Sequence, residues 1–239
     1  MQSSNNTVLI TGGATGIGFA LAKKFHDVGG NRVIIASRSE SALVSVKNTL
    51  ANVETVRCDI TVAEDRRKLA TDYAATNILI NNAGIQVNGE FWKLDDGFIK
   101  NEIDVNFQAP VLLSKLFLPN LLNKKSAAII NVSSILGVVP KDSAPVYCAT
   151  KAAIHSFSIS LRWQLEKTSV KVFDILPPLV DTAMTSGRGK GKISPEQLVE
   201  EFWLAFLSDK QEVFIGKAKL LKILTRFLPA LAEKIVRKN

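Results

Sequence analysis

Seven short runs of apolar residues recur along the chain, and most are continuous stretches of Val, Ile and Leu without alternating polar positions. A strand that is buried on both faces has this pattern, and such strands belong to parallel sheets covered by helices. The predicted strands are Thr7–Thr11, Arg32–Ala36, Val53–Cys58, Asn77–Asn81, Ala127–Val132, Val170–Leu176 and Glu212–Ile215.

The segments between these runs are long enough for crossover helices. Strands that alternate with helices predict an α/β fold, a single doubly wound parallel sheet of about seven strands with helices on both faces. No linker rich in Pro, Gly or Ser divides the chain. We therefore expect one domain over residues 1–216, with residues 217–239 as its basic, amphipathic helical extension.

A glycine-rich turn, Thr11-Gly-Gly-Ala-Thr-Gly-Ile-Gly18, joins the first predicted strand to a helical run. Glycine allows unusual backbone angles and a close approach to a pyrophosphate, and the helix N-terminus offers free N–H groups to phosphates. The alternative is a turn that binds no ligand. The spacing favours a dinucleotide-phosphate site made by Gly12, Thr15, Gly16, Ile17 and Gly18.

The second predicted strand is followed by Ser37 and Arg38. In dinucleotide-binding folds an acid near this point holds the ribose 2′-hydroxyl of NAD, whereas an Arg accommodates the 2′-phosphate of NADP. A guanidinium binds a phosphate with two parallel hydrogen bonds, and an acid would repel it. The pattern predicts NADP(H) rather than NAD(H), although an Arg here could also be a solvated surface residue.

Three further motifs follow: Asn81-Asn-Ala-Gly84, Asn131-Val-Ser-Ser-Ile-Leu-Gly137 and Tyr147-Cys-Ala-Thr-Lys151. With the glycine-rich turn they stand in the order of the short-chain dehydrogenase/reductase family, which the chain resembles over roughly residues 7–182. The resemblance implies a Rossmann-type fold and an oxidoreductase that moves a hydride between nicotinamide and a carbonyl or secondary alcohol. The 187–192 loop and the C-terminal tail also resemble the subgroup called DltE-like.

Tyr147 and Lys151 are four residues apart and share one face of a predicted helix. A free tyrosine has a pKa of about 10, and a nearby ammonium favours the phenolate. We therefore expect Lys151 to lower the pKa of Tyr147, which then acts as the general acid or base. By resemblance, Lys151 also binds the nicotinamide ribose, Ser134 holds the substrate oxygen, and Asn106 anchors a water of the proton relay.

The resemblance implies further cofactor contacts at the ends of later strands. Asp59 and Ile60 match the residues beside the adenine. The Asn82–Gly84 segment matches the turn behind the adenosine ribose. A segment after the sixth strand matches the contact with the nicotinamide amide, but Pro177-Pro178 stands where the family usually has Pro-Gly. The remaining expected contacts are Asn82, Ala83, Gly84, Pro177, Val180 and Thr182.

Composition argues against a disulfide framework, a membrane span, a metal site and nucleic-acid binding. The chain has two cysteines, Cys58 and Cys148, which predict free buried thiols rather than a disulfide framework, and we expect a cytoplasmic protein. No apolar run approaches the roughly 20 residues that span a bilayer. The two histidines, His26 and His155, lack accompanying ligands, so we expect no metal. No nucleic-acid-binding motif accompanies the net charge of +8.

Positive charge is concentrated in the tail, where seven basic residues stand against one acid. Leu220, Leu224, Phe227 and Leu231 follow helical spacing, and Pro229 divides the stretch into two short helices. Such a helix packs on its own domain or on a sister subunit. The alternative is peripheral membrane contact, with Leu and Phe in lipid and basic residues at anionic head groups.

The sequence thus favours an NADP(H)-dependent reductase or dehydrogenase acting on a small carbonyl or alcohol substrate. By resemblance it forms a homodimer or homotetramer. The alternative function is a catalytically silent nucleotide-binding regulatory or membrane-surface protein. The complete set Asn106, Ser134, Tyr147 and Lys151 argues against it, because a binding protein needs no such set.

Overall fold

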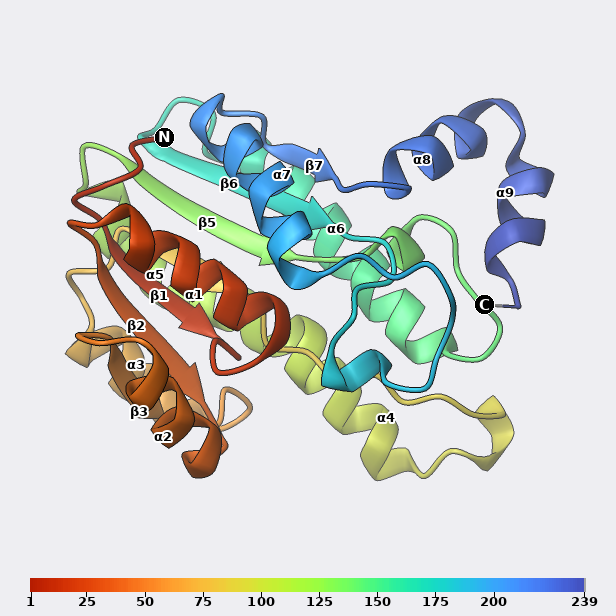
Figure 1. The fold of residues 1–239 in the computed structure, drawn as a ribbon, viewed down its shortest axis with the longest axis horizontal. Coiled ribbons are helices and arrows are strands. Elements are labelled where there is room, and N and C mark those ends of the chain that lie inside the picture. The colour runs from red at the N-terminus through yellow and green to blue at the C-terminus, as the bar shows by residue number, and fades with distance from the viewer. Residues whose placement is uncertain (239) are drawn as a thin grey trace.

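The computed structural model describes residues 1–238 and contains one seven-stranded sheet (Figure 1). All its neighbouring strands pair in parallel, in the order β3-β2-β1-β4-β5-β6-β7. The predicted fold class is confirmed. The strands are β1 Thr7–Thr11, β2 Arg32–Ser37, β3 Glu54–Arg57, β4 Ile78–Asn81, β5 Ala127–Val132, β6 Val170–Leu176 and β7 Glu212–Phe214.

Helices cover both faces of the sheet, as continuous apolar strands require. Between α4 and α5 the chain makes a π-helical turn, Asp104–Gln108. The helices are α1 Gly16–Val28, α2 Glu40–Thr49, α3 Ala63–Asp72, α4 Asp96–Ile103, α5 Ala109–Leu122, α6 Pro145–Gln164, α7 Pro195–Leu207, α8 Ala218–Phe227 and α9 Pro229–Val236.

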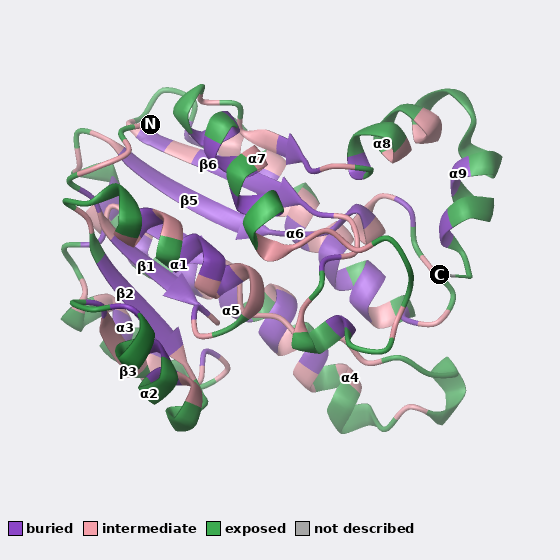
Figure 2. Cartoon of the chain, viewed as in Figure 1, coloured by how far each residue is buried: buried purple, intermediate pink, exposed green. Residues whose placement is uncertain are grey.

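Two apolar cores lie on opposite faces of the sheet, and the strands between them are mostly buried, except the edge strand β3 (Figure 2). The first core packs α1, α2 and α7 on the sheet, with edge-on contacts of Phe25 with Trp203 and Phe206. The second packs α3, α5 and α6, with Phe117 among its fully buried side chains. Both cores hold the strands so that their carboxyl ends meet along one edge.

The order of the sheet reverses between β1 and β4. The chain leaves β1 toward α1 on one face, whereas it leaves β4 toward α4 and α5 on the other. Ligands of such sheets bind in the crevice that opens at this switch point, beyond the carboxyl ends of the strands. The register aligns Thr11, Asn81 and Asn131 across this edge.

The tail forms two helices, and the second begins at Pro229 as predicted. Ala218, Ala232 and Val236 are buried, and the backbone N–H of Asp142 donates to the Arg237 carbonyl over 3.0 Å. The inner side of the tail therefore packs on its own domain. Its outer side is largely exposed in Figure 2. Over residues 1–238, no helix combines the length and apolarity needed to cross a membrane.

Candidate active site

A cavity of about 870 Å³ lies along the carboxyl edge of the sheet and collects nearly all the predicted site residues. Two predicted residues do not line it: Gly18 is packed beneath the glycine-rich turn, and Asn106 is buried behind the wall. Those that do line it are Gly12, Thr15, Gly16, Ile17, Ser37, Arg38, Asp59, Ile60, Asn82, Ala83, Gly84, Ser134, Tyr147, Lys151, Pro177, Val180 and Thr182.

Two glycines of the glycine-rich turn have no room for a side chain. Gly12 and Gly16 have φ of +61° and +53°, a region that disfavours other residues. A Cβ on Gly12 would lie 2.8 Å from Ala83 Cα, and one on Gly18 would lie 2.3 Å from the Gly12 carbonyl oxygen. The turn is thus a bare backbone surface at the N-terminus of α1, as a pyrophosphate site requires.

Hydrogen bonds tie this turn to the one after β4. The Thr11 hydroxyl accepts from the backbone N–H groups of Asn82 and Ala83 at 3.1 and 3.2 Å. The Asn82 amide donates to the carbonyls of Thr11 and Gly12 at 3.1 and 3.0 Å. Asn82 therefore holds the two turns together with its side chain, a role that its motif alone did not reveal.

The outer end of the cavity carries Ser37, Arg38 and Asp59. Arg38 is more than half exposed, and its guanidinium lies 3.9 Å from the Asp59 carboxylate. Burial raises the pKa of Asp59, but hydrogen bonds from Thr61 and the charge of Arg38 outweigh it, so the pKa is lowered overall. The carboxylate is therefore ionised and steadies Arg38, while the exposed guanidinium stays accessible.

Tyr147 is buried at the inner end. Burial raises its pKa to about 12, although a side-chain hydrogen bond with Ser134 and the charge of Arg188 act in the opposite direction. The expected lowering of this pKa by Lys151 is therefore wrong in this structure. The Lys151 ammonium donates to the Val132 carbonyl at 2.8 Å and lies 5.7 Å from the centre of the Tyr147 ring.

Lys151 is itself destabilised in its charged form. Burial lowers its pKa to about 8, and the negative groups Asp174 and Glu102 offset this only in part. Asp174 is fully buried on β6, and His155 lies 2.5 Å from it through Nδ1. His155 thus packs against a buried carboxylate outside the cavity wall, which agrees with a packing role rather than a catalytic one.

Asn106 lies in the π-helical turn, and its side chain makes three hydrogen bonds. Its Oδ1 accepts from the Ile85 N–H at 2.9 Å, while Nδ2 donates to the Ile85 carbonyl at 2.9 Å and to the Thr150 hydroxyl at 3.2 Å. The amide therefore fixes the segment after Gly84 against α6. The Oδ1 atom accepts one of the two hydrogen bonds that an amide oxygen can accept.

Sequence reasoning missed Glu102. It is fully buried on α4, one oxygen accepts from the Val87 N–H at 2.8 Å, and the other has no hydrogen-bond partner among the described residues. Burial raises its pKa, and the charge of Lys151 offsets this in part. Nothing distinguished this acid within an ordinary helical run, because its burial depends on packing between α4 and α6.

Segments distant from the motifs complete the substrate side of the cavity. Residues 177–191 pass over it, and Pro177 and Val180 line it despite the Pro-Pro departure. Lys141 contributes from the segment before α6. The tail adds an apolar wall that sequence reasoning did not place here, made by Leu220, Leu221, Leu224, Ile235 and Val236.

Comparison with known proteins agrees with this geometry. A family model described as short chain dehydrogenase matches residues 6–192. The chain belongs to the short-chain dehydrogenase family. The resemblance drawn from the four motifs is confirmed. The glycine-rich turn, Ser134, Tyr147 and Lys151 line one cavity in a member of this oxidoreductase family.

Two relatives define its place in the family. The uncharacterized oxidoreductase DltE of Bacillus subtilis (strain 168) is 44% identical over 238 residues, covering 95% of this chain and 94% of its own. This confirms the DltE-like resemblance. An uncharacterized oxidoreductase of Staphylococcus aureus (strain MRSA252) is 32% identical over 216 residues, covering 87% of this chain and 93% of its own.

Solved short-chain dehydrogenases have the same fold. One from Burkholderia cenocepacia J2315, in complex with NADP, has a TM-score of 0.90 at 26% identity and covers all of both chains. One from Burkholderia phymatum, in complex with NAD, has a TM-score of 0.87 at 22% identity, covering 100% of this chain and 97% of its own.

The buried Glu102 predicts a pH-dependent stability. A carboxyl whose folded pKa is raised stabilises the protein fully below its unfolded pKa of about 4.5, and this stability is lost as the pH rises through the folded value. Glu102→Gln resembles the protonated acid. We expect urea denaturation to show that the free energy of unfolding of the variant rises relative to that of wild type between pH 4 and pH 7.

The matched control is Glu166→Gln, which removes an exposed carboxylate. Its stability difference from wild type should change little with pH. An equal pH dependence in both variants, or none in Glu102→Gln, would contradict the assignment.

Proposed function

We propose that the protein is an NADP(H)-dependent oxidoreductase that transfers a hydride between nicotinamide and a carbonyl or secondary alcohol substrate. One observation carries this proposal. A single cavity joins a bare glycine turn at a helix N-terminus to a buried Tyr147, which is hydrogen-bonded to Ser134 with Lys151 alongside.

The cofactor fits the cradle that the glycines leave. Gly12, Thr15, Gly16 and Ile17 would hold the pyrophosphate at the N-terminus of α1, whose first turn contains no acid to repel it. Asp59, Ile60 and the Asn82–Gly84 turn would hold the adenosine. Thr182, whose Cγ2 would lie 3.1 Å from a Cβ on Gly16, would meet the nicotinamide half together with Pro177 and Val180.

The exposed Arg38 guanidinium supports NADP(H) over NAD(H), because Ser37 stands where an acid would bind the ribose of NAD. When bound, the nicotinamide supplies or accepts the hydride. The dehydrogenase of Burkholderia cenocepacia was solved with NADP and that of Burkholderia phymatum with NAD. Family membership therefore does not decide between the two cofactors, and the proposed preference for NADP(H) rests on Ser37 and Arg38.

Tyr147 and Ser134 act on the substrate oxygen. With a pKa of about 12, Tyr147 is a protonated donor at neutral pH, so it can give its proton to the oxygen as a carbonyl is reduced. Ser134 holds the same oxygen by its hydroxyl. Lys151 would bind the nicotinamide ribose and supply positive charge below its pKa of about 8, and Asn106 positions the Gly84–Ile85 backbone.

The first test is a fluorescence titration with NADPH and NADH. We expect tighter binding of NADPH by wild type, and about tenfold to hundredfold weaker NADPH binding by Arg38→Ala, because one charge-assisted contact is lost. NADH affinity should change little. Arg67→Ala, which removes an exposed Arg from α3, is the control.

Tyr147→Phe separates the enzyme from a silent nucleotide-binding protein. Reduction of ketones should fall about 10²- to 10⁴-fold in this variant while NADPH still binds. Equal turnover in both proteins, or no turnover of any ketone by wild type, would favour the nucleotide-binding alternative. No binding of either nucleotide would reject the proposal as a whole.

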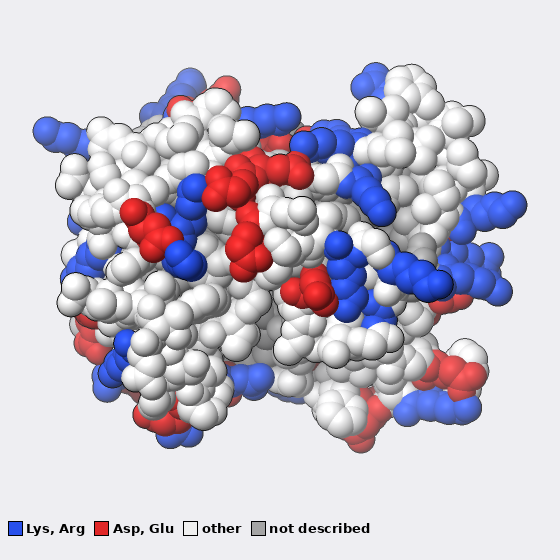
Figure 3. All heavy atoms as spheres, in the orientation of Figure 1, with Lys and Arg blue, Asp and Glu red and all other residues white. Residues whose placement is uncertain are grey.

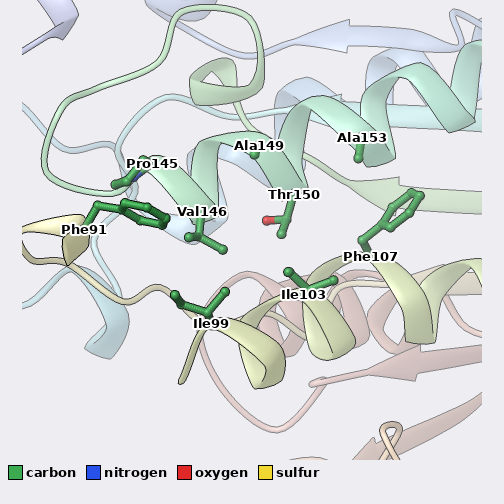
Figure 4. Close-up of a pocket in the computed structure, with 9 residues that line it drawn as sticks. All are labelled: Phe91, Ile99, Ile103, Phe107, Pro145, Val146, Ala149, Thr150 and Ala153. Atoms are coloured by element: carbon green, nitrogen blue, oxygen red, sulfur yellow. The ribbon is translucent and has the colours of Figure 1, made fainter. Parts of the chain in front are cut away.

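We also propose a homodimer or homotetramer, with a second copy packed on the groove between α4 and α6. Figure 4 shows the side chains of Phe91, Ile99, Ile103 and Phe107 facing those of α6 across a cavity of about 400 Å³. Phe91 and Ile103 are exposed large apolar residues, which a monomer rarely gathers on one face.

The two buried free thiols are compatible with the proposed cytoplasmic compartment.

Light scattering coupled to size exclusion tests this interface. Ile103→Glu should shift the protein toward monomer, because the interface would have to bury an unpaired charge. Val44→Glu introduces the same charge at an exposed apolar position on α2 and should leave the mass unchanged. Dissociation of neither variant, or of both, would contradict the proposed face.

We further propose that the outer side of the tail contacts an anionic membrane surface. Ile223 and Phe227 are exposed there, and Figure 3 shows Lys and Arg gathered on this side of the molecule. Two tail lysines are already paired within the domain, Lys219 with Glu201 and Lys222 with Glu212. The remaining basic residues are the ones available to lipid phosphates.

Flotation with vesicles of phosphatidylcholine and phosphatidylglycerol at low salt tests the contact. Wild type should float with the vesicles, and Phe227→Glu should stay in the soluble fraction. Val44→Glu is again the charge-matched control. Wild-type protein that stays soluble would reject membrane contact and leave the tail with its packing role alone.

A further inference from the structure

The substrate end of the cavity is lined by cations, and no carboxylate lines that end in the described structure. Lys141, Arg188, Lys190 and Lys217 line it, and the one carboxylate in the described lining, Asp59, lies at the other end beside Arg38. Within residues 1–238, neither Lys141 nor Arg188 takes part in an ion pair. The charge is therefore available to a ligand.

Of these cations, Arg188 gives the clearest evidence for a bound anion. Its backbone N–H donates to the Thr185 carbonyl at 3.1 Å, which fixes the turn that brings its side chain to the cavity. Its Nη1 atom is buried without a hydrogen-bond partner in the described structure. Leaving a buried charged donor unpaired is costly, and a guanidinium fork matches the two oxygens of a carboxylate.

Lys141 reaches the same region from the segment before α6. Its backbone N–H donates to the Cys148 sulfur at 3.5 Å, which holds this segment beside the residue that follows Tyr147. Burial lowers the pKa of Lys141, and the charge of Arg188 lowers it further. The two cations therefore repel each other, and an anion between them would relieve that repulsion.

Phosphate groups of the cofactor have other places in the cavity. The glycine-rich turn offers the helix N-terminus to the pyrophosphate, and Arg38 stands at the expected position of the 2′-phosphate. Arg188 instead acts electrostatically on Tyr147 and Lys141. Its charge is thus placed at the reacting end of the cavity.

We propose that Arg188 and Lys141 bind an anionic group of the substrate, so that the enzyme acts on carbonyl or alcohol compounds bearing a carboxylate or phosphate near the reacting carbon. This inference rests on the proposed reductase function. The apolar remainder of the substrate would lie against Leu179 and the tail residues Leu221 and Leu224, which line the same cavity. Oxo acids with a short alkyl chain have this chemistry.

Calorimetric titration of the NADP⁺-saturated protein tests the site without requiring turnover. The probes are 2-oxooctanoate and 4-oxooctanoate, and their methyl esters are the matched uncharged controls. We expect at least one acid to bind about tenfold or more tightly than its ester. Arg188→Gln and Lys141→Gln should each remove most of this preference, and Arg67→Gln should retain it.

Acids that bind no more tightly than their esters would overturn the proposal, as would a preference that survives in both variants. NADP⁺ affinity is measured in the same variants. If Arg188→Gln weakens NADP⁺ by the same factor as the acids, the arginine serves the cofactor and the proposal also falls.

Reduction of the same probes with NADPH distinguishes this failure from failure of the proposed function. Acids and esters reduced at equal rates would leave the reductase intact and overturn the anion site. An acid preference in kcat/KM that Arg188→Gln removes would support the site. If no probe is reduced, the reductase proposal is in question, and the calorimetric comparison still decides whether this cavity binds anions.

Discussion

The close approach of two backbone turns underlies everything else in this structure. The turn after β1 and the turn after β4 touch where Gly12 meets Ala83 and Gly18 lies beneath Asn82, with no space for a Cβ on either glycine. Thr11 and Asn82 tie them with four hydrogen bonds. This contact aims the N-terminus of α1 into the crevice and sets the Gly84 segment beside Lys151, whose Nζ would lie 3.6 Å from a Cβ on Gly84.

Burial controls the chemistry around that contact. Tyr147, Lys151 and Glu102 are all buried, and removal from water disfavours the charged form of each of these groups. Burial is accordingly the largest influence on the pKa of Tyr147, Lys151 and Glu102. Tyr147 is therefore protonated at neutral pH, and Lys151 keeps its positive charge below a pKa of about 8.

The two ends of the cavity are built differently. The cofactor end consists of short turns that directly follow strands, so its shape depends on the sheet. The substrate end consists of residues 177–191, Lys141 and the two tail helices, which come together from distant parts of the chain. Such loops carry specificity in many enzymes because they can change while the scaffold persists.

Features that depend on local pattern could be predicted from the sequence. Buried strands show as apolar runs, so the strands were predicted to within one residue at each end, and positive φ requires glycine at Gly12 and Gly16. The spacing of Tyr147 and Lys151 places both on one helical face. The burial of Glu102, the direction of the Tyr147 pKa shift, the position of Arg188 and Lys141 in one cavity and the tail as a wall of that cavity are set by the tertiary structure. Those features depend on desolvation and on contacts between residues far apart in the chain, and no local pattern records either.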